Sequence, residues 1–235
     1  MHITYQPSTA EEAWSYIAYW HRGYHNHLKH FRYGFKQFIP NHPAIIEMYE
    51  QENLIDEQKS KYRDIFFTEI YNEKDLRKFD SLLADSAVPA LQKVVDILTP
   101  MAKKWGIEFP NKVEIVTTYG KGGSYNYENP GITFRMTDYK PEFMTGLLQH
   151  EFIHLLIEIP IIKKYNVPQD LKERIVDIIG FEYFGKPVQS NFENSFANKY
   201  ITIEAIENDL PKAVAQMMTD YAIFKAKQQT GKSQE

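Results

Sequence analysis

The sequence contains no cysteine, and this absence excludes several kinds of chemistry at once. Disulfide bridges, cysteine-ligated metal sites and a thiol nucleophile all require a thiol. A chain of 235 residues can be stable without disulfides, because it is long enough to bury a sizeable core. Any metal ion that this protein binds must therefore be held by His, Asp or Glu.

Long apolar runs and blocks of basic residues are also missing. No segment approaches the roughly 20 apolar residues of a membrane-spanning helix. The amino-terminal stretch MHITYQPSTAEEAW lacks the basic start and apolar run of a secretory signal. The formal net charge is −4, which makes nucleic acid an improbable partner. We therefore expect a cytoplasmic protein that binds neither membrane nor nucleic acid.

The first part of the chain has the apolar periodicity of helices. Residues spaced three or four apart predict a long helix from Trp14 to Phe38, a polar helix over about 44–72 and a third over 74–104. The stripe of the third helix contains Leu76, Phe79, Leu83, Ala87, Leu91, Val94 and Leu98. The first helix is crowded with aromatic residues, and we interpret it as core or as a surface for a protein partner.

The pattern changes after Trp105 and Gly106. VEIVTTY, residues 113–119, and GITFRMT, residues 131–137, have the alternation and β-branched residues of strands. The glycine-rich GKGGS between them is expected to be a mobile loop. GITFRMT is expected to be an edge strand, to which an extended peptide could pair through its backbone.

Further helical segments follow the predicted strands. One begins at Pro141 and is expected to stop at Pro160, and the next runs from about residue 169 to Phe184. The chain from about residue 197 is expected to form one or two more helices and a frayed polar tail, KAKQQTGKSQE.

These elements predict an α+β fold that is mainly helical, with a small mixed or antiparallel sheet. The helical region is expected to cover residues 1–105 and the region that carries the strands residues 106–235. The two regions could also form one continuous domain.

The segment QHEFIHLLIEIP contains the pattern H-E-x-x-H at His150, Glu151 and His154. On a helix, His154 lies about 40° around from His150 and about 6 Å along the axis, so both imidazoles can point at one atom. Zinc suits two imidazole ligands. Glu151 is set back on the flank, where it can reach a water rather than the metal. The alternative is a pair of hydrogen-bonded core histidines.

A catalytic zinc site uses a third protein ligand, and two glutamates compete for this role. Glu173 and Asp177 lie one turn apart on the helix after the motif, so Glu173 could complete the site while Asp177 accepts a hydrogen bond from a ligand histidine. Glu158 is nearer in sequence, but its Cα lies about 12 Å along the helix axis from that of His150. We therefore favour Glu173.

His150-Glu151-x-x-His154 followed by Glu173-x-x-x-Asp177 resembles the gluzincin metallopeptidases, the thermolysin-like clan. The resemblance covers about thirty residues. It implies a zincin-like fold with its sheet over the metal-binding helix, one zinc ion per chain, a peptide or protein substrate and peptide-bond hydrolysis. It also implies His150, His154 and Glu173 as ligands and Glu151 as the residue that activates water.

Gluzincins also use a downstream histidine or tyrosine to stabilise the oxyanion, and this sequence has no histidine after His154. The remaining candidates are Tyr165, Tyr183, Tyr200 and Arg174. The missing histidine keeps open a catalytically inactive zinc-binding or regulatory protein, and the aromatic first helix keeps open a protein-interaction role with a structural metal.

Two other patterns are excluded or set aside. The extended metzincin motif needs glycine and histidine where this chain has Ile157 and Pro160, and deformylase-like sites need a cysteine. The segment HRGYHNHLKH has four histidines, which we interpret as core or surface residues rather than ligands because no acid takes the place of Glu151: His21, His25, His27 and His30.

Overall fold

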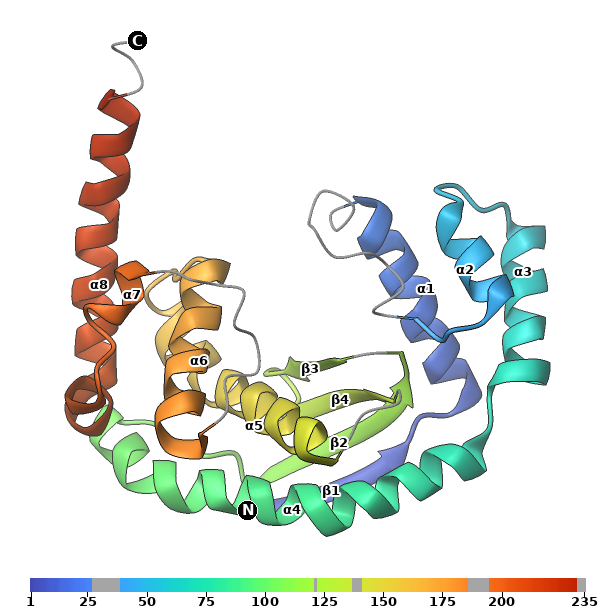
Figure 1. Ribbon diagram of the computed structural model, residues 1–235, viewed down its shortest axis with the longest axis horizontal. Coiled ribbons are helices and arrows are strands. Elements are labelled where there is room, and N and C mark those ends of the chain that lie inside the picture. Colours follow the sequence, from blue (N-terminus) through green and yellow to red (C-terminus); the bar gives the residue numbers. More distant parts are fainter. Residues whose placement is uncertain (27–38, 121, 137–140, 186–194, 232–235) are drawn as a thin grey trace.

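The computed structural model describes residues 1–26, 39–120, 122–136, 141–185 and 195–231 (Figure 1). It is an α+β protein, mainly helical with one small mixed sheet. In chain order the elements are β1 His2–Pro7, α1 Ala10–Asn26, α2 Pro43–Glu50, α3 Asp56–Ile65, the π-helical turn η3 Phe66–Ile70, α4 Glu73–Trp105, β2 Lys112–Tyr119, β3 Gly122–Asn126, β4 Gly131–Met136, α5 Pro141–Ile157, the π-helical turn η4 Glu158–Lys163, α6 Gln169–Phe184, α7 Ser195–Asn198 and α8 Ile203–Gly231.

The sheet has the strand order β1-β2-β4-β3. β1, β2 and β4 are parallel, whereas β3 runs antiparallel to β4 at the edge. The strand predicted at 113–119 is confirmed as β2, and the one at 131–137 as β4, although residue 137 lies outside the described residues. The expectation that GITFRMT is an edge strand is wrong, because β3 pairs with its outer side.

β3 itself was expected to be part of a mobile loop. The glycines of GKGGS have no strand propensity of their own, so only the backbone pairing with β4 makes this segment a strand. β1 was also not predicted, and it pairs with β2 across more than a hundred residues of sequence. Neither β1 nor β3 was predicted as a strand, because each is defined by pairing between strands, which local periodicity does not reveal.

The register of β3 decides which side chains face the helices. Gly123 lies opposite Phe134 and Tyr125 opposite Ile132, and residues opposite each other in a pair share one face of the sheet. Phe134 and Ile132 are buried in the core that includes α4 and α5. Gly123 and Tyr125 therefore face α5, whereas the hydroxyl of Ser124 is hydrogen bonded to that of Tyr16 on α1.

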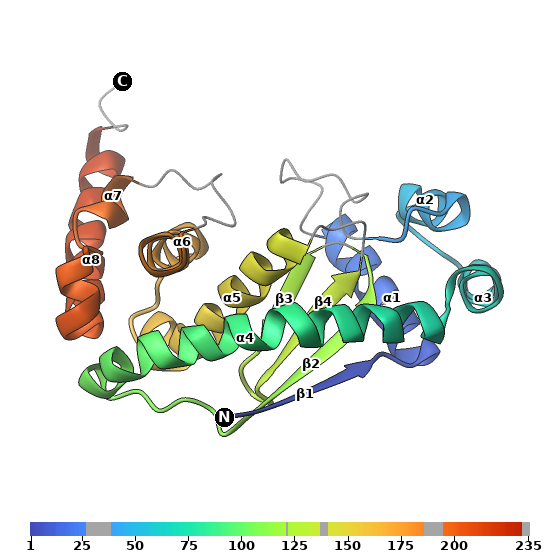
Figure 2. The ribbon, with the colours of Figure 1, turned by 60° about the horizontal axis from the view of Figure 1, so that its bottom comes forward.

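The long helix expected at 74–104 is confirmed as α4. It runs along the molecule in Figure 1, with α3 near its first residues and α8 beside its last, and in Figure 2 it lies alongside α5. β1 and α4 contribute to the same core as the sheet, α5, α6 and α8. A second core is formed by α1, α2, α3 and η3, with these buried members: Ala13, Ile17, Ile39, Ile45, Met48, Tyr49, Tyr62 and Phe66.

Two other helical predictions need correction or restriction. The single helix expected over 44–72 is divided into α2, α3 and η3, because residues 51–55 are not helical and the chain turns there so that both α2 and α3 reach the second core, through Met48 and Tyr62. The helix expected from Trp14 is confirmed as far as Asn26, and its continuation to Phe38 lies outside the described residues.

Pro160 does not end the helix that carries the H-E-x-x-H motif. α5 passes directly into η4, since Ile161 and Ile162 are buried in the core and this packing outweighs the helix-breaking tendency of proline. α6 begins after Pro168 as predicted. The tail expected to be frayed is helical as far as Gly231.

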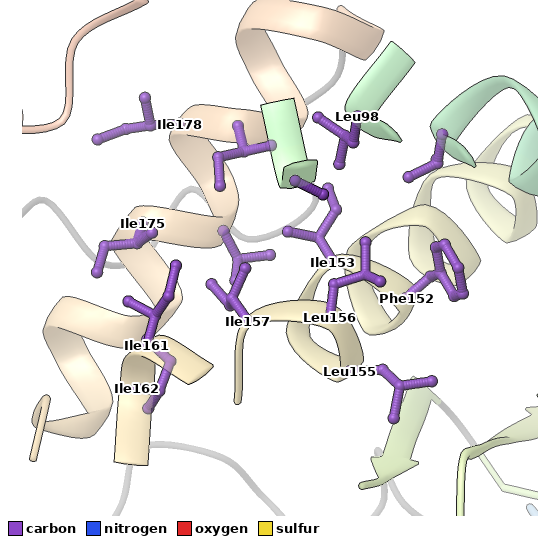
Figure 3. Close-up of a cluster of buried hydrophobic side chains, with 14 of the residues drawn as sticks. Leu98, Phe152, Ile153, Leu155, Leu156, Ile157, Ile161, Ile162, Ile175 and Ile178 are labelled. Atoms are coloured by element: carbon purple, nitrogen blue, oxygen red, sulfur yellow. The ribbon is translucent and has the colours of Figure 1, made fainter. Parts of the chain in front are cut away.

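Apolar packing fixes α5 on several sides. Its residues 146–157 and Glu158 after them are all buried. Figure 3 shows Ile153, Leu156 and Ile157 packed toward side chains of η4 and α6 and near Leu98 of α4. Phe152 stacks on the ring of Phe109. The polar residues of this helix are therefore held in a rigid apolar frame.

Phe134 offers a test of this core. It is fully buried, and its ring stacks on that of Phe79 at a centroid distance of 5.5 Å. We expect Phe134→Ala to lower the free energy of unfolding by about 3–5 kcal/mol, measured by urea denaturation, because it leaves a cavity. The control Ile203→Ala removes a side chain that is 48% exposed and should change stability by no more than about 0.5 kcal/mol. Equal effects would contradict this placement of the core.

Candidate metal centre

Two helices bring together three side chains with metal-binding atoms. His150 and His154 project from α5 and Glu173 from α6. The Nε2 atoms of His150 and His154 lie 3.0 Å apart. Glu173 Oε2 lies 3.1 Å from Nε2 of His154 and 3.3 Å from Nε2 of His150. All three residues are buried. This group could bind a metal ion, and it is the one such group among the residues that the structure describes.

The spacing of these atoms fits a tetrahedral ion. Two ligand atoms of a zinc ion with bonds of about 2.0–2.1 Å lie about 3.3 Å apart, and the three distances here are 3.0, 3.1 and 3.3 Å. Two imidazole nitrogens at 3.0 Å need a proton or a metal cation between them, because two facing lone pairs would repel each other. The donor set of two imidazoles and one carboxylate is one that zinc uses.

Further polar groups hold the carboxylate of Glu173 and the ring of His150. Gln169, one turn earlier on α6, donates from its amide to Glu173 Oε1, so that Oε2 is left facing the histidines. Asp177 Oδ1 lies 3.6 Å from His150 Nδ1, on the outward side as expected but too far for a direct hydrogen bond. A cavity of about 10 Å³ adjoins both residues, close to the smallest volume that holds one water.

Burial and charge set the protonation of this group. Burial lowers the pKa of His154 to about 4, so this ring is neutral at pH 7. Burial also acts to lower the pKa of His150, but nearby carboxylates, chiefly that of Glu173, outweigh it and raise the pKa. Burial acts to raise the pKa of Glu173, but hydrogen bonds from both histidines outweigh it and hold that pKa far below its usual range. Glu173 is therefore ionised, as a ligand must be.

Glu151 lies beside this group and against the backbone of β3. A Cβ atom built on Gly123 would be 2.7 Å from Glu151 Cγ and 2.9 Å from Oε1. Only glycine permits such a close approach of a side chain to the strand. Glu151 is 6% exposed, so its carboxylate is confined between α5 and the edge strand. No local pattern indicates this role of Gly123, because GKGGS has the composition of an ordinary loop.

Tyr125 on β3 is a second residue near the metal-binding group that sequence reasoning missed. Its ring stacks on that of His154 at a centroid distance of 5.0 Å and an angle of 8°. Its hydroxyl donates to Glu158 Oε2 at 2.7 Å and accepts from Lys172 Nζ at 3.0 Å. Burial, together with the hydrogen bond to Glu158, raises the pKa of this phenol far above its ordinary value, so it stays protonated. Glu158 is thus bound to Tyr125 and does not join the metal-binding group.

Three of the four side chains proposed as oxyanion partners make polar contacts with α7 and α8. The hydroxyl of Tyr200 donates to Asp220 at 2.8 Å, that of Tyr183 lies 3.5 Å from Glu207, and Arg174 donates to Asn198 at 2.8 Å. These three polar groups are therefore directed toward α7 and α8. Tyr165 follows η4, and its ring lies under the ammonium group of Lys164.

The histidines of α1 have ordinary structural roles. His21 Nε2 lies 2.8 Å from the carbonyl oxygen of Gln51, and His25 Nε2 lies 2.9 Å from that of Tyr49. These contacts join α1 to α2 within the second core, which agrees with their interpretation as non-ligands. His27 and His30 lie outside the described residues.

Three comparisons of the chain with known proteins give no match. No family model matches the chain, and neither the curated proteins nor the solved structures contain a match. Among the helices that the structure describes, none is long and apolar enough to cross a membrane.

Substitution of the third ligand tests the metal centre. We expect the wild type to bind one Zn²⁺ per chain and Glu173→Ala to bind it more than about 100-fold more weakly, because a ligand should matter at least as much as a residue that only orients one. Glu158→Gln is the matched control, a buried glutamate near the site that should keep wild-type affinity, because the amide oxygen of glutamine can still accept a hydrogen bond from the hydroxyl of Tyr125. Isothermal titration of the metal-free proteins measures both. Loss of binding in the control but not in Glu173→Ala would make Glu158 the ligand.

Proposed function

We propose that this protein is a zinc-dependent hydrolase that cleaves peptide bonds. The observation that carries the proposal is the convergence of His150, His154 and Glu173 on one point, 3.0 to 3.3 Å from one another, with the confined carboxylate of Glu151 beside them. A metal that only stabilises a fold is usually enclosed by four protein ligands, whereas a catalytic site has three and leaves one position open. Three ligands therefore favour catalysis.

The proposal extends to a zincin-like fold of the gluzincin type. Its support is the order of elements around the site: a small sheet precedes the helix with the H-E-x-x-H motif, and the next helix brings back Glu173 and Asp177. The mixed sheet packs on α5 through β3 and β4. This order of elements and the meeting of His150, His154 and Glu173 support the proposal.

Each residue of the site has a proposed part in hydrolysis. His150, His154 and Glu173 would hold the ion, and Gln169 and Asp177 would orient these ligands. Zinc, when bound, would supply a Lewis acid that acidifies a water and polarises the substrate carbonyl. Glu151 would accept a proton from the attacking water at its carboxylate and deliver it to the leaving amine. The apolar packing around α5 would keep these groups in place before the substrate arrives.

The edge strand β3 is the proposed binding place of the substrate backbone. An extended peptide can add to an edge strand through main-chain hydrogen bonds, which hold it without reading much of its sequence. β3 carries Gly123 against Glu151 and Tyr125 against His154. A peptide paired to β3 would therefore run past both the base and the metal-binding group.

Removal of the base tests this proposal. We expect Glu151→Gln to lower the rate of peptide cleavage by about 10²–10⁴-fold while Zn²⁺ stays bound, since the amide cannot accept the proton. Cleavage of a fluorogenic peptide library, with metal content measured in parallel, gives both quantities. The control Glu182→Gln removes an exposed carboxylate from α6 and should leave both unchanged.

Two results would redirect the proposal. Cleavage that survives Glu151→Gln in the zinc-loaded protein would falsify the role of Glu151. A wild type that binds zinc tightly yet cleaves none of the peptides would favour the alternative, a catalytically inactive zinc-binding or regulatory protein. Testing small esters and amides in the same series separates a peptidase from a hydrolase of small molecules.

Gly123 gives a second, independent test of the base. In Gly123→Ala the new methyl group would collide with the side chain of Glu151 and displace its carboxylate. We expect a loss of rate on the order of 100-fold with zinc affinity retained, since a shift of about 1 Å has this effect. Gly23→Ala on α1, where an added Cβ meets nothing within 4 Å, is the matched control. Wild-type rates in Gly123→Ala would mean that Glu151 does not act from this position.

A further inference from the structure

The two histidines of the metal-binding group differ in how their outer nitrogens are placed. His150 Nδ1 faces Asp177, the arrangement by which a second carboxylate usually orients a ligand histidine. His154 Nδ1 is buried, and among the residues that the structure describes it has no hydrogen-bond partner. The usual device for fixing a ligand ring is therefore missing at His154, although its Nε2 must be aimed as accurately as that of His150.

A stacked aromatic ring takes the place of that hydrogen bond. The planes of Tyr125 and His154 are within 8° of parallel, with centroids 5.0 Å apart, the offset-stacked arrangement that aromatic pairs favour. Rotation of the imidazole out of this plane would drive its edge into the phenol ring. His150 also meets His154, with the two ring planes at 80°. The imidazole of His154 thus contacts two rings that restrict its rotation.

Tyr125 is itself held at both ends, by its backbone and by its hydroxyl, which keeps its ring against His154. Its backbone is paired with Ile132 in the sheet. Its hydroxyl is bound by Glu158 from η4 and Lys172 from α6, whose charged atoms lie 3.9 Å apart. The side chains of Glu158 and Lys172 are only 9% and 12% exposed, so solvent screens these contacts little.

We infer that Tyr125 is a positioning residue that sets the orientation of the His154 imidazole for metal binding, with Glu158 and Lys172 anchoring its hydroxyl. The inference rests on the proposed metal centre. It gives Glu158 a function other than that of a ligand, as the acceptor that fixes Tyr125. It also couples the edge strand β3 to the coordination of the ion, because a shift of the strand moves the ring that restrains His154.

The test separates the ring of Tyr125 from its hydroxyl. Tyr125→Leu and Tyr125→Val both remove the ring, and the second keeps a β-branched residue suited to a strand in case the first does not fold. Tyr125→Phe keeps the ring. Tyr127→Leu is the matched control, because Tyr127 contacts Lys163 and not the metal-binding group. Each protein is stripped of metal and titrated with Co²⁺ and Zn²⁺, following the visible absorption of Co²⁺ and the affinity for Zn²⁺.

We expect the ringless variants to bind Zn²⁺ about 10–100-fold more weakly, the range for loss of a residue that orients a ligand, and to change the Co²⁺ spectrum. Tyr125→Phe loses the anchored hydroxyl but keeps the ring, so it should lose less affinity than the ringless variants. Tyr127→Leu should keep the wild-type affinity and spectrum. Folded ringless variants with wild-type affinity and spectrum would overturn the inference alone. So would a Tyr125→Phe protein as impaired as the ringless ones. A wild type that binds neither metal would overturn the inference and the metal centre together.

Discussion

The carboxylate of Glu173 lies inside the protein, where an ionised group is stable only with hydrogen bonds or opposite charge around it. Two imidazoles supply these contacts at 3.1 and 3.3 Å, and Gln169 holds the other oxygen. The position at which α5 and α6 cross depends on these contacts between Glu173 and the two histidines. If either helix slid along the other, it would leave a charge buried without a partner. The apolar side chains around both helices keep the crossing in place.

α5 and the start of η4 present polar residues to two different partners. His150 and His154 of α5 meet Glu173 of α6. Glu151, His154 and Glu158 follow each other at helical spacing along the side that meets β3. His154 belongs to both sets. The metal-binding group, the base and the edge strand are therefore parts of one arrangement.

Local sequence was sufficient for some parts of this arrangement. The i,i+4 spacing of His150 and His154 predicted that both lie on one helix face. The sequence separation from His154 to Glu173 predicted that a second helix could return Glu173 to this face, and the structure brings the three residues together. β3 was not predictable in the same way, since its glycines carry no strand signal and its pairing with β4 alone defines it. Pro160 shows the converse case: a strong local signal to end a helix is overridden by the burial of Ile161 and Ile162. Tyr125 and Gly123 were missed because their importance comes from what α5 places opposite them.

Local sequence is enough to show which side chains share a helix face, because helical geometry repeats within a few residues and depends little on the rest of the chain. The composition excludes cysteine chemistry and limits any metal ligands to His, Asp and Glu. The packing of the folded chain decided that Glu158 binds Tyr125 while Glu173 meets the histidines. It also decided that β3 rather than β4 forms the edge beside Glu151. Such choices depend on contacts between segments far apart in sequence, whose energies no local pattern encodes.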